Sequence, residues 1–524
     1  VGSPRQEQYW RSSRWLPVFG GMMIEIAAGS VYITGLYSND LKGRFFGGDE
    51  GQRQVEQLVF ACNLGNWMPM AGFFQDSRFG GARNTALIGA ALTLVGYAGL
   101  AAWSAEVVAA PYWMVWCCWF LWGHGSGWFD NAAVSIMAQN FPRQRGRAMA
   151  LIKAFYGLSG SIITQVYNLF FFDRTTDFFM FLAIFLAGLG AVAAPSLYLV
   201  PLAQHGECDE PTRRFNLGIA LVLILALFLL GESAALELCG MRLDLKLSSF
   251  LVVLLFVALL VLLVRGSRGA SSSVVRSLDL SARERSAAAA VAAIADVPPK
   301  KALLTPNFWL LFFVVFIGMG GGLVVLNNLA QMVVALGGNH AASSTIVSVI
   351  SVANCFGRVA FGAVPDAFAE TVSRPAFLAV NVVLMICAQL LLTVGTMTTL
   401  VMGTIVAGFS YGGFWTLMPS LVVELFGTKH FASVYSCYSV AVSSASLVFS
   451  TVMAASIYDH QSLDHPGKGG IGCAGPTCFR LAHTAMAALA GVALIAAIIL
   501  TLRTAVAKRR TCRRQPMAAA ADVM

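Results

Sequence analysis

Charged side chains are scarce in this chain, because Asp, Glu, Lys and Arg together make up only 12% of its 524 residues. The sequence also lacks the GxxxxGK[ST] loop that holds nucleotide phosphates, the HExxH pattern of zinc peptidases and any cysteine spacing typical of a closed zinc site. These absences exclude an ATP-driven pump on this chain. We expect neither an enzyme activity nor a cofactor.

Apolar residues are abundant instead. They reach 57% of the chain and give a mean hydropathy of +0.71, which is too apolar for a soluble globule of this length. A spanning helix needs roughly 20 mostly apolar residues to cross about 30 Å of hydrocarbon, so the pattern predicts an all-α polytopic membrane protein with about fourteen transmembrane helices. The predicted spans lie near residues 15–37, 56–75, 84–103, 112–138, 146–171, 178–200, 215–232, 247–264, 308–334, 342–364, 376–396, 398–424, 431–456 and 480–503.

The first six and the last six spans resemble each other in sequence. "GFFQDSRFGGAR" (72–83) corresponds to "GAVPDAFAETVSR" (362–374), and "GHGSGWFDNAAVSIMAQNFPRQRGRAMALIKAFYG" (123–157) to "GFSYGGFWTLMPSLVVELFGTKHFASVYSCYS" (408–439). A parallel repeat of this kind is typical of carriers with a site between two bundles. The predicted organisation is an N-terminal cytoplasmic segment (1–14), a six-helix bundle (15–200), two additional helices (201–264), a flexible cytoplasmic linker (265–306), a second six-helix bundle (307–503) and a basic tail (504–524).

Basic residues gather on one side of the predicted membrane. They crowd residues 143–147, 265–301 and 508–514, whereas acids balance bases in the opposite loops. By the positive-inside rule we expect both termini and the linker to be cytoplasmic, and residues 465–478 to lie on the other face. The net charge of +9 therefore orients the chain and does not indicate a nucleic-acid partner. The plasma membrane and an organelle membrane are both compatible with this pattern.

Two features concern processing. The first span is too long, and its flanks too unlike a cleavage site, for a removed signal peptide, so we expect a retained anchor helix. Cys473 and Cys478, in the predicted outer loop, could form a small disulfide in an oxidising compartment.

The loop formed by Gly72, Asp76, Gly80 and Arg83 is similar to the signature of the major facilitator superfamily, with one extra residue between the acid and the following glycine. The stretches "RWLPVFGGMMIEIAAGSVYITGLYSNDLK", "NFPRQRGRAMALIKAFYGLSGSIITQVY" and "PNFWLLFFVVFIGMGGGLVVLNNLAQMVVALGG" resemble its nodulin-like branch. That branch is related to monocarboxylate and oxalate/formate carriers. The likeness covers nearly all of the membrane-embedded chain. It implies two six-helix bundles around a central cavity, and it does not identify a substrate.

Glu25 stands near the centre of the first span. At 1.5 Å per residue it is too deep for its short side chain to reach the headgroups, so it must be neutral, paired or in a wet cavity. The resemblance places the first and fourth helices on the central cavity, with His124 at a matching depth. We expect Glu25 to carry a coupling proton, with His124 or the substrate as its partner. The alternatives are a structural carboxyl and a packing role for His124.

Other polar side chains within the spans are candidates for substrate binding. Asp130 and Lys153 are nearly equidistant from the turn at residues 141–142 between two antiparallel helices, so we predict an ion pair. In the alternative, Lys153 reaches the cytoplasmic surface and Asp130 bonds to polar neighbours. Unpaired, Lys153 would be a candidate for holding an anionic substrate. The remaining candidates could equally serve as polar contacts between helices; they are Tyr32, Gln165, Asn327, Asn328 and Gln331.

Acids in the cytoplasmic loops suggest gates. The resemblance implies that such acids latch helix ends in the outward-open state. An acid that follows a helix, as Asp76 does, is unfavourable there unless it faces bases or the N-terminus of another helix. We expect Asp76 to face Arg83, Arg145 or a helix N-terminus, and a second latch to join Asp366 with Arg358 and Arg374. A solvated run of charges is the alternative.

These features predict a secondary carrier that moves a small organic solute by alternating access and is coupled to protons. A monocarboxylate or a related metabolite is among the candidate substrates, and membrane lipid surrounds the chain. One alternative is a facilitative uniporter in which Glu25 is structural. Another is a transporter-like receptor or sensor without flux.

Overall fold

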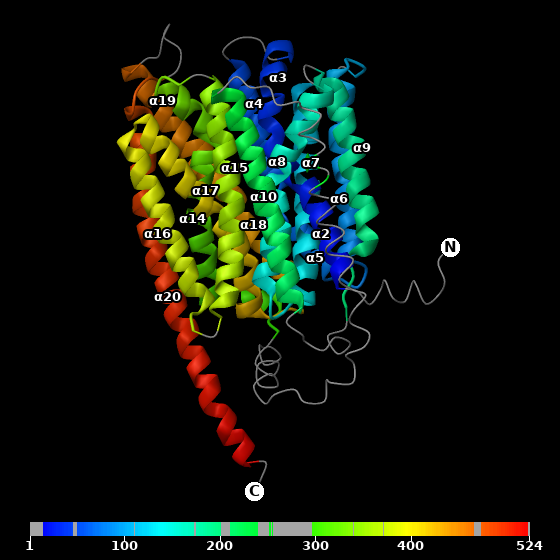
Figure 1. The fold of residues 1–524 in the computed structure, drawn as a ribbon, viewed down its shortest axis with the longest axis vertical. Helices are drawn as coiled ribbons and strands as arrows, with labels where there is room; N and C mark the ends of the chain where they lie inside the picture. Colours follow the sequence, from blue (N-terminus) through cyan, green and yellow to red (C-terminus); the bar gives the residue numbers. More distant parts are fainter. Residues whose placement is uncertain are drawn as a thin grey trace, which may run out of the picture.

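The structure is a computed structural model that describes residues 14–45, 50–108, 110–171, 174–200, 210–238, 251–252, 254, 296–338, 340–369, 371–465 and 473–521. Long helices run side by side through the molecule (Figure 1). The first half contains α2 (Trp15–Ala28), α3 (Ser38–Phe45), α4 (Glu50–Gly65), α5 (Pro69–Gln75), α6 (Ala82–Ser104), α7 (Tyr112–Asn140), α8 (Arg145–Val166) and α9 (Thr175–Ala193). After α10 (Glu210–Leu238), the second half contains α13 (Pro299–Ala302), α14 (Pro306–Ala335), α15 (His340–Ala367), α16 (Arg374–Val394), α17 (Met397–Phe426), α18 (Phe431–Ala445), α19 (Ala455–Asp464) and α20 (Thr477–Ala521).

The predicted all-α membrane architecture is confirmed. Within the described ranges, eleven helical stretches are long and apolar enough to cross a membrane. The less apolar α7 and the interrupted α4–α5 pair run beside them, so thirteen of the fourteen predicted spans are accounted for. The remaining prediction, near 247–264, falls almost entirely outside the described residues, as do the 1–13 segment and most of the linker.

Each half is a bundle with its own contacts. In the first half α6 packs on α7 and α9, and α2 on α7 and α8; in the second, α15 packs on α17, and α16 on α17 and α20. The halves meet along two seams, where α5 contacts α18 and α8 contacts α15. The additional helix α10 packs against both α8 and α15, so it covers the second seam.

The two ends of the bundle are distinguished by where the chain begins and ends. The start of α2 and the end of α20 lie at the same end, which we call the terminal end, and α20 projects beyond the other helices there (Figure 1). Successive spans alternate in direction, so α5 and α15 finish at the terminal end and α8 and α18 begin there. Residues 504–521, predicted as a basic tail, continue α20 as helix.

Three of the helices that carry the site described below change their winding. The α2 helix continues as a 3₁₀ stretch, Gly29–Leu36, and π-helical turns follow α8 at Tyr167–Phe171 and α18 at Ser446–Ala454. At Gly29 a Cβ atom would overlap the Ser159 side chain and the Tyr156 carbonyl of α8, so only glycine allows this close approach. Such changes of winding inside long helices often mark functional positions.

The last part of the linker is ordered, which corrects the expected flexible linker for residues 296–306. Asp296 Oδ1 accepts hydrogen bonds from the backbone N–H groups of Thr428 and Lys429, both at 3.1 Å, in the turn between α17 and α18. Val297 N donates to Phe426 O at 2.9 Å beside them. The chain is therefore fixed to the second half before α14 begins.

The loop before α20, which was predicted to face outward, contains a disulfide between Cys473 and Cys478, a pairing that the sequence left open. Between these cysteines, Gly475 has a φ of +102° that favours glycine, and its N–H donates to Ala335 O at 2.8 Å. The loop is thereby held against the end of α14.

Candidate functional site

Lys153 lies at the centre of a buried group of charges between the two halves. Its ammonium group forms an ion pair and hydrogen bond with Asp130 Oδ1, and its Nζ atom is 3.7 Å from Glu25 Oε1. None of the three side chains is more than 2% exposed. The predicted Asp130–Lys153 ion pair is therefore present, and Lys153 is shared with a second carboxylate that the sequence did not assign to it.

The second half contributes Arg358, whose side chain is fully buried. Its guanidinium donates from Nε to Asn354 Oδ1 at 2.7 Å, from Nη1 to the Lys153 carbonyl at 2.8 Å and from Nη2 to the Tyr32 hydroxyl at 3.4 Å. Two of these three acceptors belong to the first half. Arg358 thus joins α15 to α8 and to the 3₁₀ stretch after α2.

Aromatic rings enclose the two cations. The Lys153 Nζ atom lies 5.2 Å from the ring centroids of both Tyr156 and Trp415, and Arg358 Cζ lies 5.1 Å and 5.9 Å from the same two rings. Cations over aromatic faces are attracted by the ring quadrupole, most strongly where water is absent. Tyr435 completes the group from α18, because its hydroxyl donates to Asp130 Oδ2 at 2.8 Å.

Helix lengths explain why these residues meet. Asp366, at the end of α15, contacts the start of α8, and the two helices run antiparallel along their seam. Lys153 lies eight residues after Arg145, where α8 begins, and Arg358 lies eight residues before Asp366, so each is about 12 Å from the terminal end at helical rise. Once the contact between Asp366 and α8 is known, the same counting that predicted the Asp130–Lys153 pair places Arg358 at the depth of Lys153.

Several predicted site residues lie elsewhere. His124 does not contact Glu25: its Nδ1 is 2.8 Å from Gly65 O, and Trp128 Nε1 donates to its Nε2 at 2.9 Å. An indole N–H is only a donor, so Nε2 accepts and Nδ1 carries the proton. The neutral imidazole therefore satisfies its neighbours, and the expectation that His124 partners Glu25 is wrong.

The amide candidates also serve local contacts. Gln165 Nε2 donates to Glu232 Oε2 of α10 at 2.7 Å, so it anchors the additional helix. Asn327 and Asn328 both donate to Ser450 Oγ, at 3.0 Å and 3.3 Å, within the second half. Gln331 follows one turn later on α14. Tyr32 reaches the buried charges, because its hydroxyl accepts a hydrogen bond from Arg358.

The two predicted latches cap helix N-termini in the opposite half. Asp76 Oδ2 accepts from Ser433 N at 2.8 Å and from Ser433 Oγ at 2.6 Å, in the first turn of α18. Asp366 Oδ2 accepts from Arg147 N at 2.9 Å, in the first turn of α8. A carboxylate is stabilising at such positions. Burial nevertheless raises the pKa of Asp76, with the Ser433 hydrogen bonds acting in the opposite direction.

The bases assigned to the latches take different positions. Arg374 Nη2 binds Asp366 Oδ1 at 2.8 Å, and its Nη1 lies 3.4 Å from Glu424 Oε2. Arg145 donates from Nε to Pro142 O at 3.0 Å, close to this second latch. Within the described ranges Arg83 is exposed and forms no ion pair with Asp76. Arg358 belongs to the buried charges, so its assignment to the latch was wrong.

A row of serines continues the Asp76 latch along the α5–α18 seam. Met68 N donates to Ser439 Oγ at 2.8 Å, and Ser443 Oγ donates to Asn63 O at 3.0 Å. A Cβ at Gly72 would overlap Ser436, so the helices touch there. The residues recur at three- and four-residue spacing, on one helical face, and are Ser433, Ser436, Ser439, Ser443 and Ser446.

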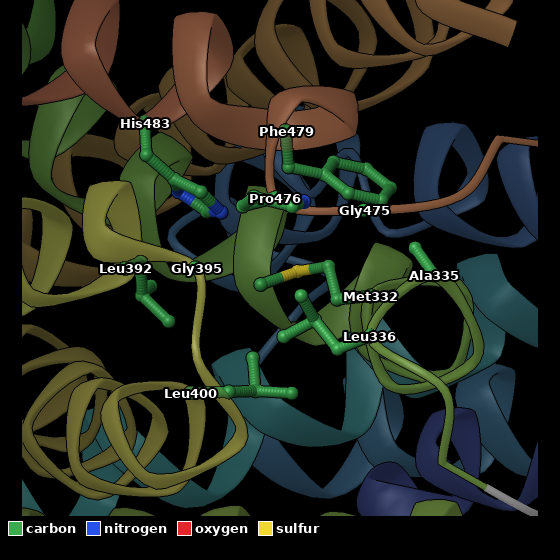
Figure 2. A pocket seen from close by; sticks show the side chains of 10 residues that line it. All are labelled: Met332, Ala335, Leu336, Leu392, Gly395, Leu400, Gly475, Pro476, Phe479 and His483. Atoms are coloured by element: carbon green, nitrogen blue, oxygen red, sulfur yellow. The ribbon is translucent and has the colours of Figure 1, made fainter. Parts of the chain in front are cut away.

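A small pocket lies in the second half beneath the disulfide loop, away from the buried charges. Figure 2 shows its mainly apolar lining, with the His483 ring directed inward between α14, α16 and α20. His483 Nδ1 is 2.8 Å from Gln389 Oε1, whose amide nitrogen donates to Gly321 O at 3.0 Å. All of these groups belong to one half, so the pocket would not be remodelled when the halves move relative to each other.

The chain matches two known protein families, one in each half. Residues 14–264 match the nodulin-like family, and residues 291–508 match the family described as NFD4, C-terminal domain. The chain belongs to the nodulin-like branch of the major facilitator superfamily. It is accordingly a multi-pass membrane protein, as its apolar helices indicate. Two of its relatives are named as probable transporters and its structural neighbours are symporters, which indicates a transporter and not an enzyme.

Individual relatives of this nodulin-like chain match only in part. The "Probable transporter MCH1" of Yarrowia lipolytica is 29% identical over 144 residues, which is 26% of this chain and 29% of the relative. The "Protein NUCLEAR FUSION DEFECTIVE 4" of Arabidopsis thaliana is 24% identical over 170 residues, 32% of this chain and 28% of the relative. Each match spans less than a third of the curated relative.

Solved structures extend the likeness to nearly the whole fold. The proton:xylose symporter XylE is 13% identical with a TM-score of 0.56, covering 93% of this chain and 95% of that one. The Escherichia coli fucose:proton symporter FucP is 12% identical with a TM-score of 0.50, covering 93% and 98%. At these identities the likeness shows the fold alone.

Proposed function

We propose that this protein is a proton-coupled secondary carrier for a small organic anion, which works by alternating access between its two halves. The observation that carries the proposal is Lys153, held between Glu25 and Asp130 and linked through its carbonyl to Arg358 of the other half. A transporter-like sensor needs no such buried charges where two bundles meet. A charged side chain at this depth in a membrane has a high free-energy cost, so such residues are usually paired and functional.

The balance of the buried charges explains why binding of an anionic substrate would be coupled to proton uptake. When ionised, two carboxylates face two cations, so the buried group is neutral before a substrate enters. An anionic substrate would leave it with an uncompensated negative charge in a dry environment, which is strongly unfavourable. One proton on Glu25 restores neutrality. Glu25 is suited to receive it, because neither of its carboxylate oxygens has a hydrogen-bond partner among the described residues.

The bound substrate would replace some of the contacts that Lys153 and Arg358 make within the protein. Protonation of Glu25 frees Lys153 from one of its two carboxylates, and Arg358 offers a planar guanidinium that matches a carboxylate in two-point binding. The adjacent Trp415 and Tyr156 rings provide apolar contact for a small carbon skeleton. A monocarboxylate fits this chemistry, and we assign proton coupling to Glu25 rather than to His124.

The latches define the state of the carrier. Both lie at the terminal end, which we place in the cytoplasm on the positive-inside rule. With these contacts made, the cytoplasmic route is closed, and the substrate would arrive from the opposite face. The relatives named as probable transporters and the proton symporters that share the fold support this cycle.

The test begins with a ligand-stabilisation screen across metabolite classes, since a ligand that binds only the native state raises the unfolding temperature. Uptake of the best ligand into proteoliposomes is then measured with and without an inward proton gradient. We expect gradient-driven accumulation that Glu25→Gln abolishes while exchange continues, and that His124→Gln retains as the control. Uptake indifferent to the gradient would identify a uniporter, and stabilisation without uptake a sensor.

A further inference from the structure

Tyr435 is the group that distinguishes the two carboxylates around Lys153. One oxygen of Asp130 binds Lys153 and the other accepts from the Tyr435 hydroxyl, whereas neither oxygen of Glu25 accepts a hydrogen bond from a described residue. Glu25 Oε1 lies 3.7 Å from Lys153 Nζ, and the carboxylate also interacts electrostatically with Arg358 and Tyr435. The hydroxyl arrives from α18, in the opposite half. A hydrogen bond to an ionised acceptor is roughly twice as strong as a neutral one, so the hydroxyl favours the ionised form of Asp130.

The same segment of α18 closes the terminal end. Ser433, two residues before Tyr435, gives its N–H and hydroxyl to Asp76 of the first half. Phe431 stacks on the Tyr435 ring at 5.3 Å with 10° between the planes, so this turn is rigidly packed. An opening of the latch that carried α18 away from α5 would therefore also remove Tyr435 from Asp130.

We infer that Tyr435 is a positioning residue that makes Glu25, and not Asp130, the carboxylate that receives the coupling proton while the terminal end is closed. This inference depends on the proposed function in one respect, namely that the proton received by Glu25 is the one coupled to transport. The titratable and charged groups facing Asp130 are Lys153 from α8, Tyr435 from α18 and, beyond Lys153, Glu25 from α2 and Arg358 from α15. Tyr435 is the one among them that both bonds Asp130 directly and belongs to the other half.

The chain offers a matched control one helical turn away. Tyr438 is fully buried on the same helix, as Tyr435 is, and its hydroxyl donates to Phe308 O at 3.3 Å within the second half. Tyr438→Phe therefore removes an equivalent hydroxyl without touching the inter-half contacts. An effect that Tyr435→Phe shows and Tyr438→Phe does not show therefore cannot come from the loss of a buried hydroxyl in general.

The test is infrared difference spectroscopy of the purified protein during acidification, in which protonated carboxylic acids show a separate carbonyl band. We expect one buried band in the wild type and in Tyr438→Phe, absent in Glu25→Gln. In Tyr435→Phe we expect a second band that Asp130→Asn removes. A single Glu25 band in Tyr435→Phe would overturn the inference. This measurement needs no substrate or flux, so a failure of the proposed transport leaves its outcome unaffected.

A second variant covers the case in which Tyr435→Phe does not fold. Asp76→Ala removes the latch at the surface without changing any residue of the buried group, and it should loosen the contact of α18 with the first half. The Asp130 band should then appear in a protein that still contains Tyr435. In proteoliposomes, Tyr435→Phe should also shift the pH midpoint of transport upward by about one unit, equivalent to a tenfold change in proton affinity. Asp76→Ala without an Asp130 band would contradict the inference.

Discussion

The two seams between the halves are built on different chemistry. The α5–α18 seam consists of serine hydroxyls, one glycine and backbone groups, whereas the α8–α15 seam buries Lys153 and Arg358 and is covered by α10. Serine hydroxyls can return to carbonyls of their own helix when a partner leaves; Ser436 and Ser439 already donate to Ser433 O and Ser436 O. The first seam can therefore open with fewer unpaired polar groups than the second, although the Met68 N–H would lose its Ser439 partner.

The latches at the ends of these seams differ in the same way. Among the described residues Asp76 accepts hydrogen bonds from the backbone and hydroxyl of Ser433 and interacts electrostatically with His430. Asp366 is tied both to Arg147 N and to Arg374, which also reaches Glu424. The lesson is that sequence symmetry between the halves does not imply energetic symmetry. Most of the free energy that resists opening should reside in the α8–α15 seam.

The largest effect should follow from breaking the charged seam at its centre. Lys153→Met leaves Asp130 and Glu25 close together without their cation, which should destabilise the protein by about 3–5 kcal/mol and abolish transport. Asp130→Asn combined with Lys153→Met should recover much of the stability. The measurement is a double-mutant cycle of unfolding free energies, and strict additivity would show that the pair does not interact.

Closing the seams requires glycines at their crossing points. A Cβ at Gly146 would overlap Gly362 O and the Asp366 side chain, and one at Gly72 would overlap Ser436 and Ala432 O. Leucine at either position should prevent the closed terminal end, with a loss of about 2–3 kcal/mol. Gly188→Leu, where a Cβ meets nothing within 4 Å, is the control. Cysteine accessibility of the terminal end would report the closure, and equal labelling of all three variants would contradict the expectation.

The latches provide a direct contrast. Asp366→Asn weakens a buried pair with Arg374 and should lower the unfolding free energy by about 2 kcal/mol. Asp76→Ala removes only a helix cap and should lower it by about 1 kcal/mol. Chemical denaturation of the two purified variants checks the order. If Asp76→Ala proves the more damaging, the proposed asymmetry between the seams is reversed.

The smallest effect belongs to the serine row. Ser436→Ala removes a hydroxyl that donates to its own helix, so the unfolding free energy should change by about 0.5 kcal/mol or less. Ser439→Ala, which leaves the buried Met68 N–H without its partner, should cost about 1–2 kcal/mol. Comparing the two by thermal unfolding separates local hydroxyls from those that join the halves.

Most of the fold could be predicted because membrane helices satisfy their own backbone groups and must be long and apolar. The sequence therefore predicted the spans that contain α2, α4 to α10, α14 to α18 and α20. It did not predict α3 or a separate α19, and α20 continues to Ala521, well beyond the predicted end near residue 503. It could not predict the 3₁₀ stretch at Gly29–Leu36, which depends on the close approach of α8. Nor could it predict that Asp296 anchors the linker, because that contact uses backbone groups more than 130 residues away.

The site was predicted where local geometry sufficed. Asp130 and Lys153 belong to one hairpin, so counting residues from its turn brought them together. Arg358 and Tyr435 come from the other half, and their positions depend on how two bundles dock. His124 failed as a candidate because its depth matches that of Glu25 but its ring is taken by Gly65 and Trp128.

The docking of Asp296 makes the turn between α17 and α18 a mechanical anchor point. Tension along the preceding chain would be transmitted through Asp296 to the amides of Thr428 and Lys429, only a few residues before Ser433. Only a few residues separate this anchor from the latch, and they lead directly into α18. A protein that pulled on the segment before Asp296, or a modification that shortened its reach, would thus act on the weaker of the two latches.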